Sequence, residues 1–344
     1  MKIKLDNRYL NTGEEKQFLH PIGKRHDGTN IGLPLVGIMG EKPGPVLGIT
    51  AGVHGDEYEG PEALRLIIDE IDPKELRGGI ICTPHANMSA LEIHHRSGWI
   101  DRLDMNRSFP GKNNGYITER AADIVVKEII EQSDYFLDLH SAGLSYDLEA
   151  YVGFNDTEGK LGEESYELAK AFGVPLLYSS TPFPNVMRLE AHKRNIPAIL
   201  VESGGEGRCK TDRLSIMKTG ISNVMKYLGM IDGELQELPN KYTVIKAPSY
   251  GEFLHSPASG YLRGKVGIGE KVKKGDLLGE IVDVFGNKII SITSPLDGII
   301  LIVRTIPSIR LGDWAFSIVE ITNEGNNQDF VIESHKECVS NETF

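Results

Sequence analysis

A short stretch near the start of the chain decides the fold, GVHGDEYEG at residues 52–60. An apolar run at residues 46–50 leads into it, and a helical pattern at residues 61–71 leads out of it. His54 and Glu57 therefore stand where a predicted strand ends and a predicted helix begins, which is where open α/β sheets place their sites. Their spacing lets both side chains face one metal ion, and both types are ordinary zinc ligands. On its own the pattern would more often belong to a solvated loop, so a metal site is predicted only if the rest of the chain supplies a third ligand.

Short β-rich apolar runs alternate with helical patterns as far as residue 228. Strands are predicted at residues 34–39, 46–50, 79–83, 135–140, 149–154 and 198–202, and helices at residues 61–71, 118–132, 161–172 and 212–228. The residues before this region read as short strands and turns. The alternation predicts an α/β fold with a doubly wound, mainly parallel sheet that helices cover on both faces.

The pattern changes near residues 238–240. From residue 243 to residue 321 short β runs are separated by many glycines, and no helical pattern appears. Such runs predict a small all-β barrel or sandwich. We therefore expect a catalytic domain over residues 1–238, a β-rich domain over residues 239–322 and a polar tail over residues 323–344.

The composition is that of an ordinary globular protein, with 40% hydrophobic and 25% charged residues among 344. A formal net charge of −12 argues against nucleic acid and anionic membranes as partners. The first residues lack the apolar core of a signal peptide, and no apolar run approaches the ~20 residues of a membrane span. Three widely separated cysteines suit a reducing compartment. These features predict a cytoplasmic protein.

The candidate third metal ligand is His140, which ends the apolar strand pattern at residues 135–140. A histidine at the end of a strand is more often structural, but His54 and Glu57 reverse that preference. Asp138 lies two residues earlier on the same face of the strand, where its carboxylate can orient the imidazole ring. We therefore expect these residues to complete one site.

Glu202 also ends an apolar strand pattern and precedes a glycine-rich turn. A carboxylate at the tip of a buried strand is costly unless it is paired or catalytic. As a general base it would take a proton from water and pass it to a leaving nitrogen. The alternative, a solvated loop acid, suits Glu206 better. Asp56 and Glu59, beside the first two ligands, are expected to be solvated or to lie behind them.

The segment DMNRSFPG at residues 104–111 places an amide, Asn106, beside a guanidinium, Arg107. Arginine is suited to bidentate binding of a carboxylate. Arg96 is a second candidate cation. Taken separately, each of these residues would more often be an ordinary surface residue.

Four segments appear together in one order: HGDE at residues 54–57, DMNRSFPG at residues 104–111, DLHS at residues 138–141 and VESGG at residues 201–205. In this order they resemble the succinylglutamate desuccinylase/aspartoacylase family of zinc deacylases, which have a zinc-carboxypeptidase-like fold. The resemblance covers roughly residues 35–320. Residues 55–61 look most similar to the branch that includes N-acetyl-diaminobutyrate deacetylases.

The resemblance assigns a role to each candidate. His54, Glu57 and His140 would bind one zinc ion, and Glu202 would be the general base. Arg96 would stabilise the oxyanion of the tetrahedral intermediate.

The same resemblance implies that Asn106 and Arg107 hold the substrate carboxylate. Two positions depart from the pattern of the nearest branch. Residues 97–100, SGWI, stand where Thr/Ser-Pro is common, and residues 141–143, SAG, stand where paired glycines are expected. These departures bear on the substrate rather than on the chemistry.

The β-rich end of the chain resembles the barrel-sandwich fold of biotinyl and lipoyl domains, with SPLDG at residues 294–298 matching a late turn. In a carrier the modified lysine would fall near Asn287, and Lys288 is one position away from it. We therefore expect a cap or an assembly surface rather than a carrier, with a homo-oligomer left open.

The sequence predicts a zinc-dependent hydrolase that cleaves the amide bond of a small N-acyl amino acid through metal-activated water and a glutamate base. Two alternatives stay open, a metallocarboxypeptidase acting on short peptides and a non-catalytic acyl or biotinyl carrier. A serine hydrolase is disfavoured because the Gly-x-Ser-x-Gly elbow is missing from the sequence.

Overall fold

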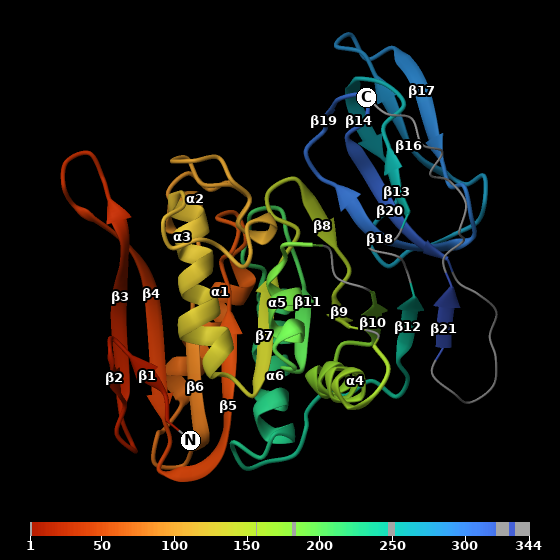
Figure 1. The fold of residues 1–344 in the computed structure, drawn as a ribbon. Coiled ribbons are helices and arrows are strands. Elements are labelled where there is room, and N and C mark those ends of the chain that lie inside the picture. Colours follow the sequence, from red (N-terminus) through yellow and green to blue (C-terminus); the bar gives the residue numbers. More distant parts are fainter. Residues whose placement is uncertain (1, 156, 181–183, 247–251, 321–329, 334–344) are drawn as a thin grey trace.

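The computed structural model describes residues 2–155, 157–180, 184–246, 252–320 and 330–333. A ten-stranded sheet runs through the molecule in the order β21-β12-β10-β9-β11-β7-β5-β6-β4-β3 (Figure 1). Its strands are β3 (Glu15–Lys24), β4 (Asn30–Met39), β5 (Lys42–Thr50), β6 (Arg77–Thr83), β7 (Tyr135–His140), β9 (Tyr151–Phe154), β10 (Leu176–Ser179), β11 (Ala198–Glu202), β12 (Thr243–Lys246) and β21 (Phe330–Glu333). A separate hairpin joins β1 (Lys4–Leu5) to β2 (Arg8–Tyr9).

Most neighbouring strands of this sheet are parallel, as the sequence predicts. The antiparallel pairs are β3 with β4, β4 with β6 and β9 with β11. In the parallel centre, residues 46–50 of β5 and most residues of β7 and β11 are buried, which explains the continuous apolar sequences there. The carboxyl ends of these three strands therefore meet at one edge of the sheet.

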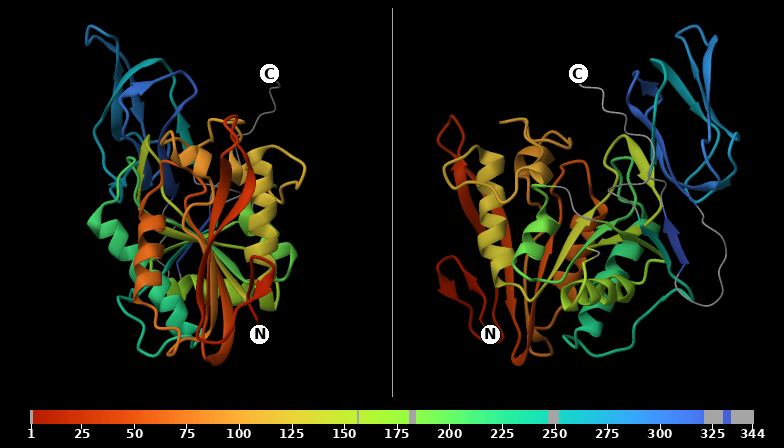
Figure 2. Two further views of the ribbon diagram at one scale, coloured as in Figure 1. Left: turned by 90° about the vertical axis from the view of Figure 1, so that its left-hand side faces the viewer. Right: turned by 45° about the vertical axis from the view of Figure 1, so that its right-hand side comes forward.

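Helices cover both faces of the sheet (Figure 2). One face packs against α1 (Glu59–Glu70), α4 (Lys160–Phe172) and α6 (Thr211–Tyr227), and the other against α3 (Ile117–Ile124) and α5 (Met187–Lys193). The segment predicted as a helix over residues 118–132 continues from α3 through a π-helical turn, η2 (Val125–Ile129), and a 3-10 turn, η3 (Ile130–Gln132). Two further short helices, α2 (Met88–Leu91) and η1 (Met105–Arg107), lie in the loops.

Two antiparallel sheets form the β-rich region. One has the order β13-β20-β18-β15 and the other β17-β16-β14-β19. Their strands are β13 (Glu252–His255), β14 (Gly260–Gly264), β15 (Lys271–Val272), β16 (Leu277–Val282), β17 (Lys288–Thr293), β18 (Gly298–Arg304), β19 (Ser308–Ile309) and β20 (Trp314–Glu320). The sheets share a hydrophobic core that includes Leu278, Ile300 and Phe316. The assignment of the β-rich region to the barrel-sandwich class stays a prediction.

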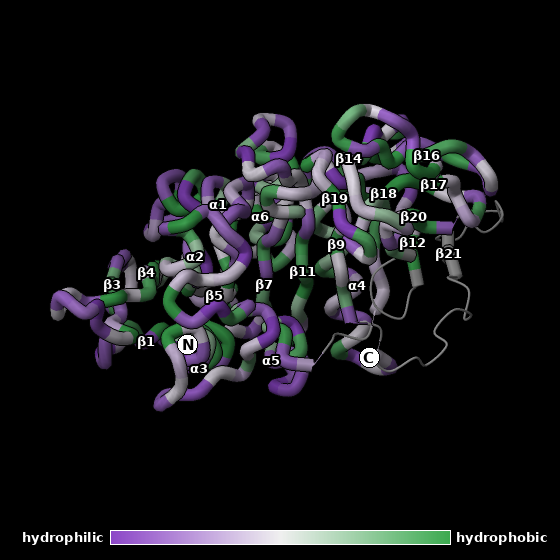
Figure 3. The backbone as a smooth tube through the Cα atoms, turned by 90° about the horizontal axis from the view of Figure 1, so that it is seen from above, coloured by the Kyte–Doolittle hydropathy of each residue, from purple (hydrophilic) through white to green (hydrophobic). Residues whose placement is uncertain are grey.

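The β-rich region lies beside β9 and β12, at the end of the central sheet away from β3 (Figure 3). Two strands at one end of the central sheet come from the sequence after residue 239: β12 pairs with β10, and β21 pairs with β12. The domain boundary at residue 239 stays a prediction. After the β-rich region the chain returns to the ten-stranded sheet through β21. Among the described residues, none of the helices is long and apolar enough to span a membrane.

A short strand that the sequence does not predict lies just before β9 and belongs to another sheet. The sequence predicts a strand over residues 149–154, whereas the structure has β8 (Tyr146–Leu148) followed by β9. β8 pairs with β18 of the β-rich region, and the chain then enters the central sheet at β9. The loop that follows His140 is therefore hydrogen-bonded into the β-rich region.

Candidate active site

The predicted residues gather at the carboxyl edge of the sheet. His54 and Glu57 follow β5, His140 is the last residue of β7, and Glu202 is the last residue of β11. His140 and Glu202 are direct partners in the β7–β11 register. The loop after β5 is shaped by Gly55, where a Cβ atom would lie 2.0 Å from the Ala90 carbonyl carbon. Only glycine lets the loop pack this tightly against α2.

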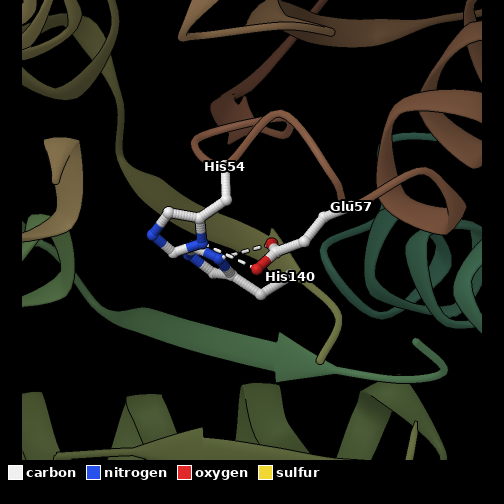
Figure 4. A group of neighbouring side chains, drawn as sticks. All are labelled: His54, Glu57 and His140. Atoms are coloured by element: carbon white, nitrogen blue, oxygen red, sulfur yellow. Dashed lines mark hydrogen bonds and ion pairs between the residues drawn. The ribbon is translucent and has the colours of Figure 1, made fainter. Parts of the chain in front are cut away.

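The three candidate ligands converge in the buried interior (Figure 4). Nδ1 of His54 lies 2.7 Å from Glu57 Oε1, and Nδ1 of His140 lies 3.0 Å from Glu57 Oε2. Donor atoms from all three side chains lie within 4.8 Å of one another, and each residue is at most 3% exposed. The structure thus brings together the three residues that the sequence singled out.

The opposite nitrogen of each imidazole faces another carboxylate. Nε2 of His54 lies 3.2 Å from Asp104 Oδ1. Nε2 of His140 lies 3.1 Å from Asp138 Oδ1, a charge contact rather than a hydrogen bond. Thr50 holds Asp138 by donating its hydroxyl proton to Oδ1 over 3.0 Å. Carboxylates in these positions fix ring orientation and tautomer in metal sites.

Asp138 was predicted for this position, but Asp104 was not. Asp104 opens the DMNRSFPG segment, and its Oδ1 also accepts the backbone N–H of Asn106 over 2.9 Å at the start of η1. Sequence reasoning took the segment as a source of cations. The signal in the sequence for the contact between Asp104 and His54 was weak. It consisted of an acidic residue at the start of a segment that other residues already linked to the site.

Opposite charges dominate the electrostatics of the cluster. Burial would raise the pKa of the Glu57 carboxyl, but the adjacent His54 and His140 rings lower it well below its usual range. Burial would also lower the pKa of His140, yet Asp138 and Glu57 raise it well above the usual value for a histidine. The pocket therefore favours an ionised Glu57 carboxylate beside a positive charge. A bound cation would supply such a charge.

Glu202 lies beside this cluster in an unusual environment. Its Oε2 is buried and accepts no hydrogen bond from the described residues. Burial is the largest cause that raises the pKa of Glu202 to about 8, with the negative charge of Glu57 adding to it and His140 opposing it. A buried carboxylate with a free oxygen and a pKa near neutrality has the properties of a general acid and base. Glu206, by contrast, pairs with Lys210 over 2.6 Å.

Arg96, predicted to stabilise the oxyanion, and the predicted substrate-binding residues Asn106 and Arg107 also line the site. Arg96 reaches it through Asp104, whose Oδ2 lies 2.9 Å from both Nε and Nη2 of the guanidinium. Its Nη1 lies 3.5 Å from Nδ1 of His54. Asn106 is buried, and its Oδ1 accepts the backbone N–H of Met187 over 3.2 Å. The exposed Arg107 donates to the carbonyl oxygen of Asn106 over 2.6 Å.

Two acids beside the ligands are more buried than a solvated position would allow. Asp56 is 8% exposed, and its Oδ2 accepts the backbone N–H of Leu144 over 2.8 Å. Glu59 is fully buried, and its Oε1 accepts the N–H of Gly205 over 3.3 Å. Both therefore lie behind the ligands, and Glu59 connects the start of α1 to the loop that follows Glu202.

These residues surround a pocket of about 550 Å³. One part of its lining consists of the triad, Glu202 and the polar residues from the loops after α2. Another part comes from the β-rich region, which contributes Phe253, Ile302 and Trp314. Sequence reasoning missed these three, because they lie far from the motifs in the chain and reach the site only through the pairing of β8 with β18.

The fold and the site together define an amidohydrolase with a candidate metal centre at the carboxyl edge of an α/β sheet. The model of the succinylglutamate desuccinylase/aspartoacylase catalytic domain matches residues 43–228, and the chain belongs to this family. The N-alpha-acetyl-L-2,4-diaminobutyric acid deacetylase of Halomonas elongata is 28% identical over 285 residues, which cover 81% of this chain and 83% of that protein.

Solved structures agree with this assignment. The product-bound ectoine utilization protein EutE (DoeB) from Ruegeria pomeroyi superposes with a TM-score of 0.82 at 26% identity, covering 88% of this chain and 94% of that one. A succinylglutamate desuccinylase/aspartoacylase from Rhodobacter sphaeroides gives a TM-score of 0.83 at 25% identity, covering 94% and 100%. The chain is thus an enzyme of the deacylase type.

Proposed function

We propose that the protein is a zinc-dependent deacylase that cleaves the amide bond of a small N-acyl amino acid. The observation that supports it most strongly is the convergence of His54, Glu57 and His140 beside Glu202 at the base of one pocket. Membership of a deacylase family gives this geometry its chemical context.

The donor set fits zinc. Two imidazole nitrogens and a carboxylate approach one point, and the far side of each ring faces Asp104 or Asp138. One zinc ion per chain would be held by His54, Glu57 and His140. When bound, it would lower the pKa of the attacking water and polarise the scissile carbonyl.

Glu202 is proposed to carry the proton. Its unpaired Oε2 can accept a proton from the attacking water and deliver it to the leaving nitrogen. A pKa raised by burial makes the side chain competent for both steps. The same carboxyl group thus acts first as a base and then as an acid.

The cations are proposed to orient and stabilise the substrate. Arg96, whose Nη1 approaches His54 Nδ1, is close enough to the reaction centre to stabilise the oxyanion. Arg107 and Asn106 would hold the carboxylate of the amino acid from the same side of the pocket. Together they would fix the amide next to Glu202.

The alternatives from the sequence are less well supported. A carboxypeptidase for peptides needs an open groove, whereas residues of the β-rich region line this pocket. A carrier needs a lysine displayed at a turn, whereas Lys288 is the first residue of β17 and pairs with Glu280 over 3.0 Å. Both observations favour a deacylase for small substrates.

The test combines activity, metal content and one substitution. The purified protein is assayed for amine release from a panel of N-acyl amino acids and from blocked dipeptides, and its zinc content is measured. Glu202→Gln should retain zinc and lose activity by about 10²–10⁴-fold, the usual contribution of a general acid–base group. Full activity of Glu202→Gln, or a protein that cleaves only dipeptides, would contradict the proposal.

A further inference from the structure

The pocket has two chemically different sides. The polar side is formed by Arg96, Asn106 and Arg107, which reach the site through Asp104 and its contact with His54 on the β5 loop. The other side begins beyond Glu202. The next strand of the sheet after β11 is β9, and its first residue, Tyr151, is the register partner of Glu202. The metal ligands therefore lie between the polar side and the β9 side.

Six apolar or aromatic residues line the β9 side. We call them the apolar wall: Tyr146, Leu148, Tyr151, Phe253, Ile302 and Trp314. Apart from Tyr151, all belong to adjacent strands of one sheet, because β8 pairs with β18, β18 with β20, and β20 with β13. Neighbouring strands therefore hold most of the apolar wall in a fixed arrangement.

Direct contacts support this continuity. The Phe253 and Trp314 rings are stacked, with centroids 4.0 Å apart and planes 20° apart. Tyr146, on β8 of the same sheet, has its ring centroid 6.3 Å from that of Trp314. Leu148 is the register partner of Ile302. Trp314 is 41% exposed, so it still has apolar surface that a ligand can cover.

Charge is distributed unevenly over the pocket. Arginines line it only from the polar side, as far as the described residues go. Arg304 donates to the Tyr146 hydroxyl over 3.2 Å and lies 3.4 Å from Asp313. It does not line the pocket. A carboxylate pushed against the apolar wall would lose its hydration without gaining a cation, which is costly.

We propose that the apolar wall binds the acyl group of the substrate and selects uncharged hydrocarbon acyl groups over dicarboxylic ones such as succinyl. The inference rests on the proposed function, which places the amide at the triad and the amino-acid carboxylate on the polar side. The acyl group is then the part of the substrate that extends past Glu202 toward the apolar wall. Aliphatic and aromatic acyl groups share the required chemistry.

The test uses four substrates that differ only in the acyl group: the acetyl, hexanoyl, benzoyl and succinyl derivatives of one amino acid. The wild-type enzyme should cleave the hexanoyl or benzoyl compound with a kcat/KM at least about tenfold above that of the succinyl compound, a typical ratio for an apolar pocket. A succinyl compound cleaved as well as both, or better, overturns the proposal. This comparison needs no variant.

Substitutions then locate the determinant. Trp314→Ala should lower kcat/KM for the hexanoyl and benzoyl compounds about tenfold and lower kcat/KM for the acetyl compound by a smaller factor. Trp314→Phe should restore most of the loss. Trp314→Lys should raise the ratio of succinyl to hexanoyl cleavage. Tyr261→Ala is the control, since Tyr261 is a comparably exposed aromatic residue on β14 that does not line the pocket.

A second series separates the acyl group from the amino-acid side chain. Here the acyl group stays acetyl, and the amino acid varies from glycine to phenylalanine. If Trp314→Ala changes selectivity in this series and not in the acyl series, the apolar wall binds the side chain and the assignment is wrong. If wild-type enzyme with bound zinc cleaves no N-acyl amino acid in either series, the proposed function fails instead.

Discussion

Asp104 is the residue whose substitution best tests how the metal centre is built. Its Oδ1 faces Nε2 of His54 over 3.2 Å, and its Oδ2 pairs with Arg96 over 2.9 Å. Asp104→Asn keeps the size of the side chain and an oxygen to cap η1, but removes the negative charge. We expect the variant to bind zinc more weakly, because His54 loses the partner that orients its ring and increases its basicity.

The expected loss follows from the contact that is removed. A hydrogen bond to a charged group contributes about 1.5–3 kcal/mol, and about 1.4 kcal/mol corresponds to a factor of ten in affinity. Zinc affinity should therefore fall about 10–100-fold, in the range typical of partners of metal-binding histidines. His54 and His140 and Glu57 remain in place, so the site should be weakened and not abolished.

Zinc affinity is measured by competition with a chelator of known affinity, and amine release is measured at saturating zinc. The matched control is Asp101→Asn in the same loop, since Asp101 binds Leu103 and Thr118 and none of the ligands. Unchanged zinc affinity in Asp104→Asn, or an equal loss in the Asp101 variant, would refute the reasoning. At saturating zinc a remaining deficit in kcat would report on Arg96, which loses its ion pair.

Three further predictions concern other parts of the chain. Burial, with the nearby positive charge of Arg65, lowers the pKa of His85 from 6.5 to about 4, so between these pH values the unfolded chain takes up a proton that the folded chain does not. The free energy of unfolding should fall by about 3 kcal/mol as the pH drops through this window. Urea denaturation at pH 7 and at pH 4 should show a smaller fall between the two pH values for His85→Gln than for the wild type. Gly55→Ala should cost about 1–3 kcal/mol and weaken zinc binding, because its Cβ would meet the Ala90 backbone; a variant with wild-type melting temperature and zinc content would be inconsistent with this. Lys288→Ala should keep activity within about twofold, and the intact wild-type mass should show no added group on this ion-paired lysine; a biotinyl or lipoyl increment would revive the carrier alternative.

Two strands of the central sheet could be predicted to the residue, for a physical reason. β7 and β11 have the bounds that the sequence indicates, since strands buried on both faces appear as uninterrupted apolar runs. Because parallel strands end at a common edge, His140 and Glu202 could be expected to meet. The convergence of the triad was thus accessible from pattern and topology together.

Other features needed contacts that no local pattern encodes. β3 is a long edge strand whose side chains alternate between exposed and partly buried, and the sequence suggested only short strands and turns there. The short α5 and β10 gave too little periodicity to be recognised. The contact between Asp104 and His54 spans 50 residues and depends on how η1 folds over the β5 loop.

The β-rich region illustrates the same limit at larger scale. Its apolar runs and glycines predicted an all-β structure, and two antiparallel sheets are found over residues 252–320. Its contribution to the pocket depends on β8, a three-residue strand that lies just before the predicted strand at residues 149–154 and was not itself predicted. Trp314 could therefore not be linked to Glu202 from the sequence.

The pairing of β21 with β12 has a consequence for the newly made protein. β12 follows the last helix of the central sheet, but its outer neighbour is supplied by Phe330–Glu333, after all the strands of the β-rich region. During synthesis β12 therefore lacks its outer neighbour until the β-rich region has been made. An open edge readily pairs with a strand of another chain. β21 thus covers the edge of β12 only after the whole β-rich region has been made, and until then this edge is open to pairing with another chain.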